Sequence, residues 1–161
     1  MNAIDFLIGQ HRAMEAKMDA LMDADKSSAK ARLLEQVGDE LTVHIASEEE
    51  LFYPAVNALR TQDILLESLE EHLSLKRLLA DLLELRATDQ TFEPKFKVLK
   101  EQAEHHHEEE EYNLFPRVRN LLNEVQLEAL GLEMMEMQDR LLRGRRPRDA
   151  VVHQIEHAAA L

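Results

Sequence analysis

The sequence predicts an all-α protein, an up-down-up-down four-helix bundle with an additional C-terminal helix. Three observations lead to this prediction. The 161 residues include only four Gly and four Pro, and the helix-favouring residues Leu, Ala, Glu, Lys and Arg are abundant. Apolar residues recur at spacings of three and four, as on one buried face of a helix. Aromatic residues make up only 4% of the chain, whereas strands are enriched in them.

Four apolar stripes define the helices of the bundle. They cover residues 4–22, 34–59, 65–83 and 92–121, and polar segments near residues 23–28, 60–63 and 88–94 separate them. A fifth helix is predicted over roughly residues 124–142, because Asn123 and Gln126 resemble a capping box and Gly144 suits a helix end. We assign residues 1–144 to a helical domain and residues 145–161 to a C-terminal tail or short helix, either packed on the bundle or frayed.

Composition narrows the classes of function. The chain has no Cys, which excludes disulfides and thiolate-bound metals. Its net charge of −13 should repel nucleic acid and anionic membrane surfaces, so we expect neither as a partner. No apolar run approaches the roughly 18 residues that a membrane-spanning helix needs. The N-terminus lacks the basic and apolar regions of a signal peptide, which predicts a cytoplasmic location.

Polar residues interrupt all four stripes near mid-helix. They are His11, His44 with Glu48, His72, and His106 with Glu110. A polar residue that faces a core costs free energy unless it is paired. In each His-x3-Glu pair, positions i and i+4 lie on the same helical face, so both side chains can reach one centre.

The loop positions predict that these residues share one level of the bundle. In an up-down-up-down bundle, residues at equal height lie symmetrically about the connecting loop. The midpoint between His11 and His44 falls near residue 27, and the midpoints for the next two helix pairs fall near residues 59 and 90. All three lie in or beside the proposed loops, so we expect the six side chains to converge in one core layer.

An internal sequence repeat, called the echo below, indicates which residues of HHHEEEE (residues 105–111) face the core. HIASEEELFYP (44–54) and HHEEEEYNLFP (106–116) both place a His ten residues before a Pro and a Glu at the fifth position. The echo aligns His106 with His44 and Glu110 with Glu48.

The remaining polar residues near these motifs are expected at the surface. They are His105, His107, Glu108, Glu109, Glu111, Glu49, Glu50, Glu70, Glu71, His153 and His157, although one residue of slack in the helix would bring Glu111 inward. Tyr53 and Tyr112 have two open interpretations, hydrogen-bonding partners of the centre or plain packing residues.

The donor set predicts a metal centre. Four imidazoles and two carboxylates without Cys suit iron or manganese better than calcium or magnesium. Two carboxylates that can bridge, with two His on each side, indicate a pair of ions. Zinc is an alternative, but it would normally use only three or four of these ligands.

The pattern His11, His44-x3-Glu48, His72 and His106-x3-Glu110 resembles the hemerythrin-like (HHE cation-binding) domain family over about residues 4–121. The resemblance implies a four-helix bundle that holds a non-haem di-iron centre. It implies that His11 and His44 serve one iron, that His72 and His106 serve the other, and that Glu48 and Glu110 bridge them.

Two departures from the oxygen-carrying hemerythrins bear on function. Those proteins have a fifth His where this chain has Lys76, and they use His-x4-Asp where this chain has His106-x3-Glu110. One iron would then be more open to small exogenous ligands, which argues against simple oxygen storage. Lys76 is expected either to face solvent or to donate a hydrogen bond to a metal-bound species.

Three functions follow for this sequence. The first is a di-iron protein that binds or senses dioxygen, nitric oxide or peroxide. The second is a di-iron enzyme with catalase, peroxide-reducing or iron-handling activity. The third is an acidic bundle without metal, which leaves six core polar residues unexplained. A homodimer through the fifth helix is a further expectation, given Met134, Met135 and Met137.

Overall fold

The computed structural model describes residues 1–144 and 146–161. Residue 145, where the sequence places the start of the C-terminal tail, lies outside the described residues. The helices are α1 (Ala3–Asp23), α2 (Ser27–Ser47), α3 (Tyr53–Val56), α4 (Gln62–Glu84), α5 (Phe92–Glu109), α6 (Phe115–Leu121) and α7 (Glu124–Leu142). Two π-helical turns, η1 (Glu48–Phe52) and η2 (Glu110–Leu114), and a 3₁₀ helix, η3 (Pro147–His153), complete them. The predicted all-α class is confirmed.

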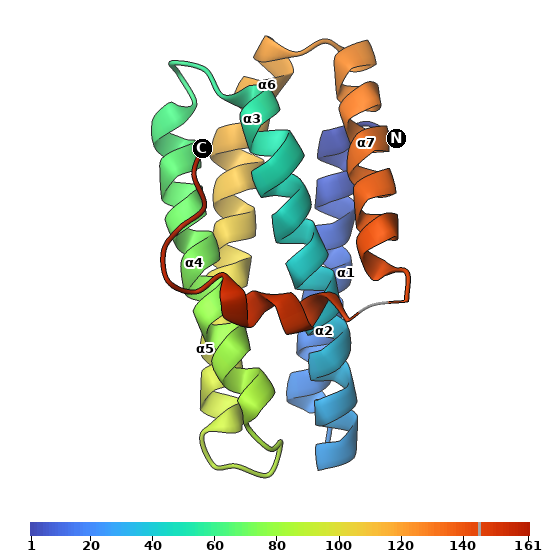
Figure 1. The fold of residues 1–161 in the computed structure, drawn as a ribbon, viewed down its shortest axis with the longest axis vertical. Helices are drawn as coiled ribbons and strands as arrows, with labels where there is room; N and C mark the ends of the chain where they lie inside the picture. The colour runs from blue at the N-terminus through green and yellow to red at the C-terminus, as the bar shows by residue number, and fades with distance from the viewer. Residues whose placement is uncertain (145) are drawn as a thin grey trace.

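The long helices form the predicted up-down-up-down bundle (Figure 1). α1 packs against α2, and α4 packs against α5, while further contacts join α1 to α5 and α2 to α4. α7 is the predicted additional C-terminal helix and packs on the outside of α1 and α2. The Asn123–Gln126 capping box opens α7, and Gly144 follows its end with a φ of 62°.

The second and fourth helices differ from their predicted form. Each was expected to run as one α-helix to Leu59 or Leu121, but each widens into a π-helical turn before a proline. Pro54 and Pro116 lack an N–H, and a proline ring clashes with the carbonyl four residues earlier. The amides of Tyr53 and Phe115 instead bond to the carbonyls of residues five positions back. A π-helical turn accommodates one extra residue and is frequently found at functional sites.

Two apolar clusters fill the bundle above and below a polar layer. One cluster contains Met14, Leu41, Leu79 and Leu99, and the other contains Leu7, Phe52, Leu69 and Leu114. On α1, His11 lies between the two clusters, and the other core histidines lie at the same level. The apolar residues on both sides therefore exclude water from a layer that is itself polar.

The C-terminal segment packs on the bundle. η3 crosses the front of the helices, and the chain then runs up along α4 (Figure 1). Arg148 is held by Asp39, which accepts hydrogen bonds from both its backbone amide (3.0 Å) and its guanidinium (2.7 Å). Val151 is buried in the first apolar cluster, and Arg77 donates a hydrogen bond to the carbonyl of Ile155. The sequence left open whether this segment packs on the bundle or frays. Its described part packs on the bundle.

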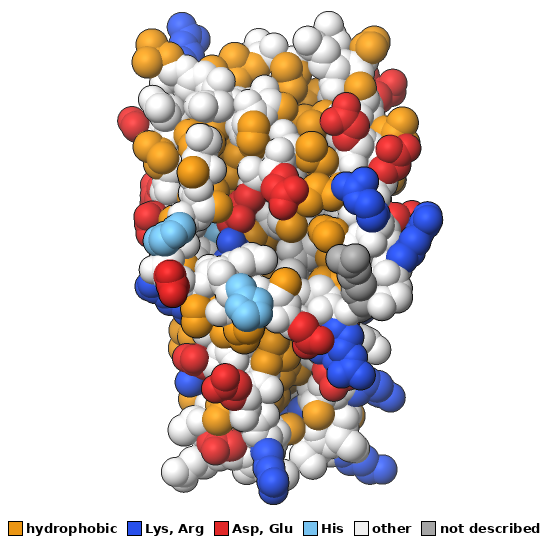
Figure 2. Space-filling view, in the orientation of Figure 1, with side chains coloured by type: hydrophobic (Ala, Val, Ile, Leu, Met, Phe, Trp, Pro, Cys, Tyr) orange, Lys and Arg blue, Asp and Glu red, His pale blue; other side chains and the backbone are white. Residues whose placement is uncertain are grey.

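In the part of the chain that the structure describes, no helix is both long and apolar enough to cross a membrane. Acidic and basic side chains are intermixed over the face shown in Figure 2, with apolar side chains between them.

Gly131 on α7 is required by a close approach to the N-terminus. A Cβ at this position would lie 2.7 Å from the carbonyl oxygen of Met1 and 2.8 Å from the amide nitrogen of Ala3. Gly131→Ala should therefore push these backbones apart and cost about 1–3 kcal/mol of unfolding free energy, as overpacking does.

Gly9→Ala on α1 is the control, because nothing lies within 4 Å of a Cβ built at that position. It should stabilise the helix by up to about 1 kcal/mol. Urea denaturation measures both, and equal effects would contradict this packing.

Candidate metal centre

The structure brings all six predicted site residues into one buried layer. His11, His44, His72 and His106 come from the four long helices, and Glu48 and Glu110 open the two π-helical turns. All six are at most 1% exposed. Ligand atoms of His11, His44, Glu48 and Glu110 lie within 4.8 Å of one another, as do those of Glu48, His72 and His106. That these residues bind metal stays a prediction, but the convergence it requires is present.

Glu48 lies between the two halves of the centre. Its Oε1 is 3.3 Å from Nε2 of His44, and its Oε2 is 3.1 Å from Nε2 of His72. Glu110 also faces both halves, because its Oε1 is 3.4 Å from Nε2 of His11 and 3.2 Å from Nε2 of His106. Each carboxylate can therefore serve two ions, as a bridging ligand does.

The donor atoms suit metal ions in number and spacing. Nε2 of His72 and Nε2 of His106 are 3.0 Å apart, and two nitrogens that each lie about 2.1 Å from one ion must be within about 4.2 Å of each other. Among the described residues, Nε2 of His11, Nε2 of His44, both oxygens of Glu48 and Oε1 of Glu110 are buried without a hydrogen-bond partner. Buried polar atoms without partners are costly, and a coordinated cation would satisfy this set together.

Each of the four histidines is oriented by a polar side chain outside the centre. The Nδ1 atoms of His11, His44, His72 and His106 lie 2.8–3.1 Å from oxygens of Glu111, Gln10, Glu49 and Glu71, respectively. Carboxylate oxygens and the amide oxygen of Gln10 only accept hydrogen bonds, so they place the imidazole proton on Nδ1 and leave Nε2 free for a metal. This is the usual arrangement around metal-binding histidines.

The sequence prediction missed these outer partners. Glu49, Glu71 and Glu111 were expected at the surface, but they are partly buried against the histidines. The echo could have identified two of them as equivalent residues, because Glu49 and Glu111 each lie five residues after the His of their motif. The π-helical turns supply the residue of slack that turns both side chains inward.

Lys76 is buried and paired with an outer carboxylate of the centre. Its side chain is buried, and Nζ donates a 2.9 Å hydrogen bond to Oε2 of Glu49, whose Oε1 accepts from His72. The expectation that Lys76 faces solvent is therefore wrong, and the expected hydrogen bond to a metal-bound species stays a prediction. The lysine instead fixes the carboxylate that orients His72.

Removing the outer carboxylate should weaken the site without removing a ligand. Glu49→Ala is expected to lower metal affinity about 10–100-fold, as loss of such partners typically does, because His72 loses its orienting acceptor. Metal titration followed by calorimetry measures the change. Glu50→Ala is the matched control, since Glu50 is exposed on the same turn. Equal affinity in the two variants would contradict the orienting role.

The two tyrosines with open interpretations behave differently. Tyr53 is fully buried, and its hydroxyl donates to Oε2 of Glu110 (3.1 Å) and lies 3.2 Å from Nε2 of His72. Tyr53 is thus a hydrogen-bonding partner of the centre. Tyr112 is 76% exposed, so neither interpretation holds for it.

The sequence prediction for His107 is wrong. It was expected on a solvated face but is only 1% exposed, and its ring stacks on that of His11 with centroids 3.9 Å apart. The physical reason is that α5 packs against both α1 and α4, so its buried face is wide enough for two adjacent residues. His105, His153 and His157 are exposed, as predicted.

The buried charges shift the pKa values of the centre. Burial opposes protonation of His106, but Glu110, Glu71 and Glu48 outweigh it and raise its pKa well above the usual range. Burial likewise opposes ionisation of Glu110, yet His106 and His11 hold its pKa well below the usual range. Burial and the neighbouring histidines, opposed only by Glu15, lower the pKa of His107 to about 4. Without metal, the centre thus pairs an anionic Glu110 with a cationic His106.

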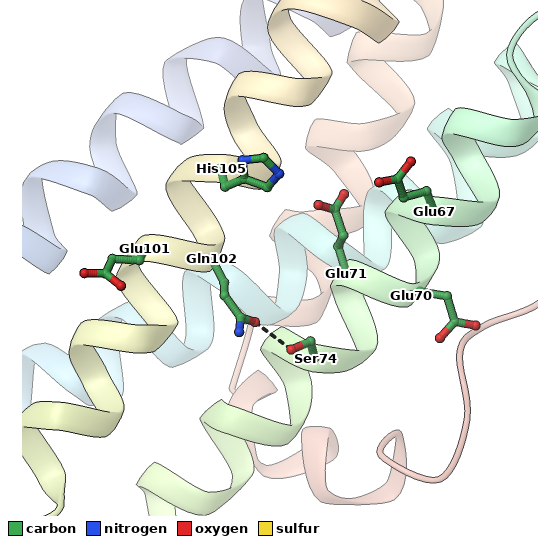
Figure 3. Close-up of a pocket in the computed structure, with 7 residues that line it drawn as sticks. All are labelled: Glu67, Glu70, Glu71, Ser74, Glu101, Gln102 and His105. Carbon is green, nitrogen blue, oxygen red and sulfur yellow. Dashed lines mark hydrogen bonds between the residues drawn. The ribbon is translucent and has the colours of Figure 1, made fainter.

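A surface groove of about 470 Å³ lies outside the buried layer, between α4 and α5. It is lined by Glu67, Glu70, Glu71, Ser74, Glu101, Gln102 and His105 (Figure 3). Glu71 links the groove to the centre, because its Oε1 accepts the hydrogen bond from Nδ1 of His106.

An antiparallel bundle with buried histidines and carboxylates gathered at mid-height is the arrangement of a helical cation-binding domain. Residues 2–118 match the Hemerythrin HHE cation binding domain, and the chain belongs to that family. A crystal structure of an HHE cation binding domain-containing protein from Mycobacterium kansasii has the same fold. It superposes with a TM-score of 0.78 at 22% identity, covering 94% of this chain and 99% of that one.

A curated relative from Nostoc sp. is described as a DNA nickase. It is 26% identical over 133 residues, which is 83% of this chain. This chain spans only 38% of the length of that relative.

Proposed function

We propose that the protein is a non-haem di-iron protein that engages small oxidants or gases, namely dioxygen, nitric oxide or peroxide, in a binding or sensing role. The observation that carries the proposal is the position of Glu48, whose two oxygens face histidines of opposite halves of the centre. Such a carboxylate suits two ions and has no comparable role in a site for one.

The donor set supports iron as the metal. Imidazole and carboxylate ligands without thiolate suit iron and manganese better than calcium or magnesium. When bound, a pair of irons would supply the redox chemistry. Manganese and zinc are the alternative metals, and elemental analysis of the purified protein distinguishes them from iron.

The chain's own residues shape the reactivity of the site. Apolar clusters on both sides of the layer exclude bulk water, which strengthens electrostatic interactions inside. Tyr53 holds a proton at its hydroxyl, because burial, Glu110 and Glu48 raise its pKa well above the usual range. Its O–H donates to Glu110 beside His72, so Tyr53 orients that carboxylate and keeps a proton at this side of the centre.

The alternative is an enzyme that disproportionates or reduces peroxide or handles iron. Iron-loaded protein should be mixed with hydrogen peroxide while dioxygen is followed with an oxygen electrode. Sustained dioxygen release that is lost in Tyr53→Phe would favour the enzyme.

Peroxide-inert protein with reversible nitric oxide or azide spectra would support the binding role. If the protein binds no iron after anaerobic loading, both functions are contradicted.

Metal uptake should release protons at neutral pH. Glu110, Glu71 and Glu48 outweigh burial and raise the pKa of His106 well above its usual range in the metal-free protein, so this imidazole carries a proton that a metal must displace, and the pKa of His11 is raised in the same direction. Metal affinity should therefore rise with pH through the neutral range and fall as the solution is acidified. Calorimetry in two buffers of different ionisation enthalpy measures the protons released. Uptake at pH 7 without proton release would contradict these pKa shifts.

The DNA-directed activity in the name of the Nostoc relative is not proposed for this chain. Its net charge of −13 disfavours association with a polyanion, and the match covers only 38% of that relative.

A further inference from the structure

His107 is a buried imidazole that the predicted ligand set does not use. It directly follows His106 on α5, but it faces α1, whereas His106 faces α4. Its side chain is as buried as those of the four predicted histidines. A buried imidazole needs partners for both ring nitrogens, because an unpaired polar atom in the core is costly.

Only one ring nitrogen of His107 has a partner among the described residues. Nδ1 lies 2.9 Å from Oε1 of Glu15, and this carboxylate places the proton on Nδ1. Nε2 is buried and has no hydrogen-bond partner in the described chain. The four predicted histidines share this arrangement, with Nδ1 held from outside by a polar side chain and Nε2 directed inward.

The position of His107 assigns it to one half of the centre. A ring nitrogen of His107 lies within 4.8 Å of nitrogens of both His11 and His44. The other half is formed by Glu48, His72 and His106. Stacking on His11 accounts for the plane of the ring, since the two planes differ by 8°, but it leaves Nε2 without a partner.

We propose that His107 is a fifth histidine ligand, binding through Nε2 to the metal ion that His11 and His44 hold. This inference rests on the proposed di-iron function. It gives three imidazoles to the half formed by His11 and His44 and two to the other half. The half with His72 and His106, which Tyr53 borders, would then have fewer protein ligands and be the half more open to a small exogenous ligand.

Counting the bound imidazoles in the wild-type protein tests the proposal directly. Cobalt(II) replaces iron as a paramagnetic probe, and each bound imidazole keeps its Nδ1 proton and gives one exchangeable, strongly shifted proton resonance. Five such resonances are expected with His107 as a ligand. Four resonances would overturn the proposal while leaving the di-metal centre intact. The absence of any shifted resonance would contradict metal binding by this layer.

Variants locate the additional ligand. His107→Gln retains a hydrogen-bonding side chain facing Glu15 but removes the imidazole, so it should lose one shifted resonance. Its affinity for one of the two ions should fall by more than the roughly 10–100-fold typical of an outer partner. His105→Gln is the control, because His105 is exposed on the same helix. Unchanged resonances and affinity in a folded His107→Gln protein would overturn the proposal.

Discussion

His106→Ala is expected to cost the protein at least one of its two metal ions. His106 is buried with its Nε2 3.0 Å from that of His72 and 3.2 Å from Oε1 of Glu110. The substitution removes one of the two imidazoles of this half of the centre and leaves Glu71 without its partner. We expect the affinity for at least one ion to fall by more than about 100-fold, beyond the effect of losing an outer partner. Metal content after gel filtration measures the loss.

His105→Ala is the matched control for this experiment. The two histidines are adjacent on α5, but His105 is exposed and lines the surface groove (Figure 3). Its substitution should leave the metal content unchanged. If the two variants retain metal equally, the register of α5 that places His106 in the centre is contradicted.

Glu48→Ala is the second substitution with a large expected effect. It removes the carboxylate whose oxygens lie 3.3 Å from His44 and 3.1 Å from His72. Both halves of the centre lose a donor together, so we expect the variant to retain less than one ion per chain. The metal-induced gain in thermal stability should disappear with it, because a ligand stabilises the folded state only in proportion to its occupancy. Differential scanning fluorimetry with and without iron(II) measures this gain.

Glu50→Ala serves as the control for Glu48→Ala. Glu50 lies in the same π-helical turn and is exposed, so its loss alters local helix composition but not the centre. The expected outcome is a metal-induced stabilisation equal to that of the wild-type protein. A Glu48→Ala protein that still gained this full stabilisation would exclude a bridging role for Glu48.

The fold and the level of the centre were predictable from the sequence because both depend on simple periodicity. Apolar spacing identifies helices and their buried faces, and the loop midpoints place the interrupting polar residues at one height. His11, His44, His72 and His106 interrupt apolar stripes, so their burial could be inferred without knowing their partners.

The outer residues required tertiary information. Glu71 and Glu111 sit beside the stripes, and their contacts with histidines of other helices depend on how the helices are rotated. The π-helical turns shift the register just where Glu49 and Glu111 occur, because Pro54 and Pro116 interrupt regular bonding. The sequence shows the prolines but not which of the available distortions the helix adopts.

His107 was missed because a helix in a bundle corner has two neighbours. α5 contacts both α1 and α4, so its buried face extends beyond the stripe that one partner would require. The packing of the C-terminal segment was likewise undecided, since it depends on an ion pair between Arg148 and the distant Asp39.

We propose that one buried layer holds two ions bridged by Glu48 and Glu110. Mössbauer spectroscopy of oxidised protein loaded with isotope-enriched iron tests it most directly. We expect two ferric ions per chain, coupled to a diamagnetic ground state at low temperature. One iron per chain, or the magnetic splitting of isolated high-spin ferric ions, would contradict it.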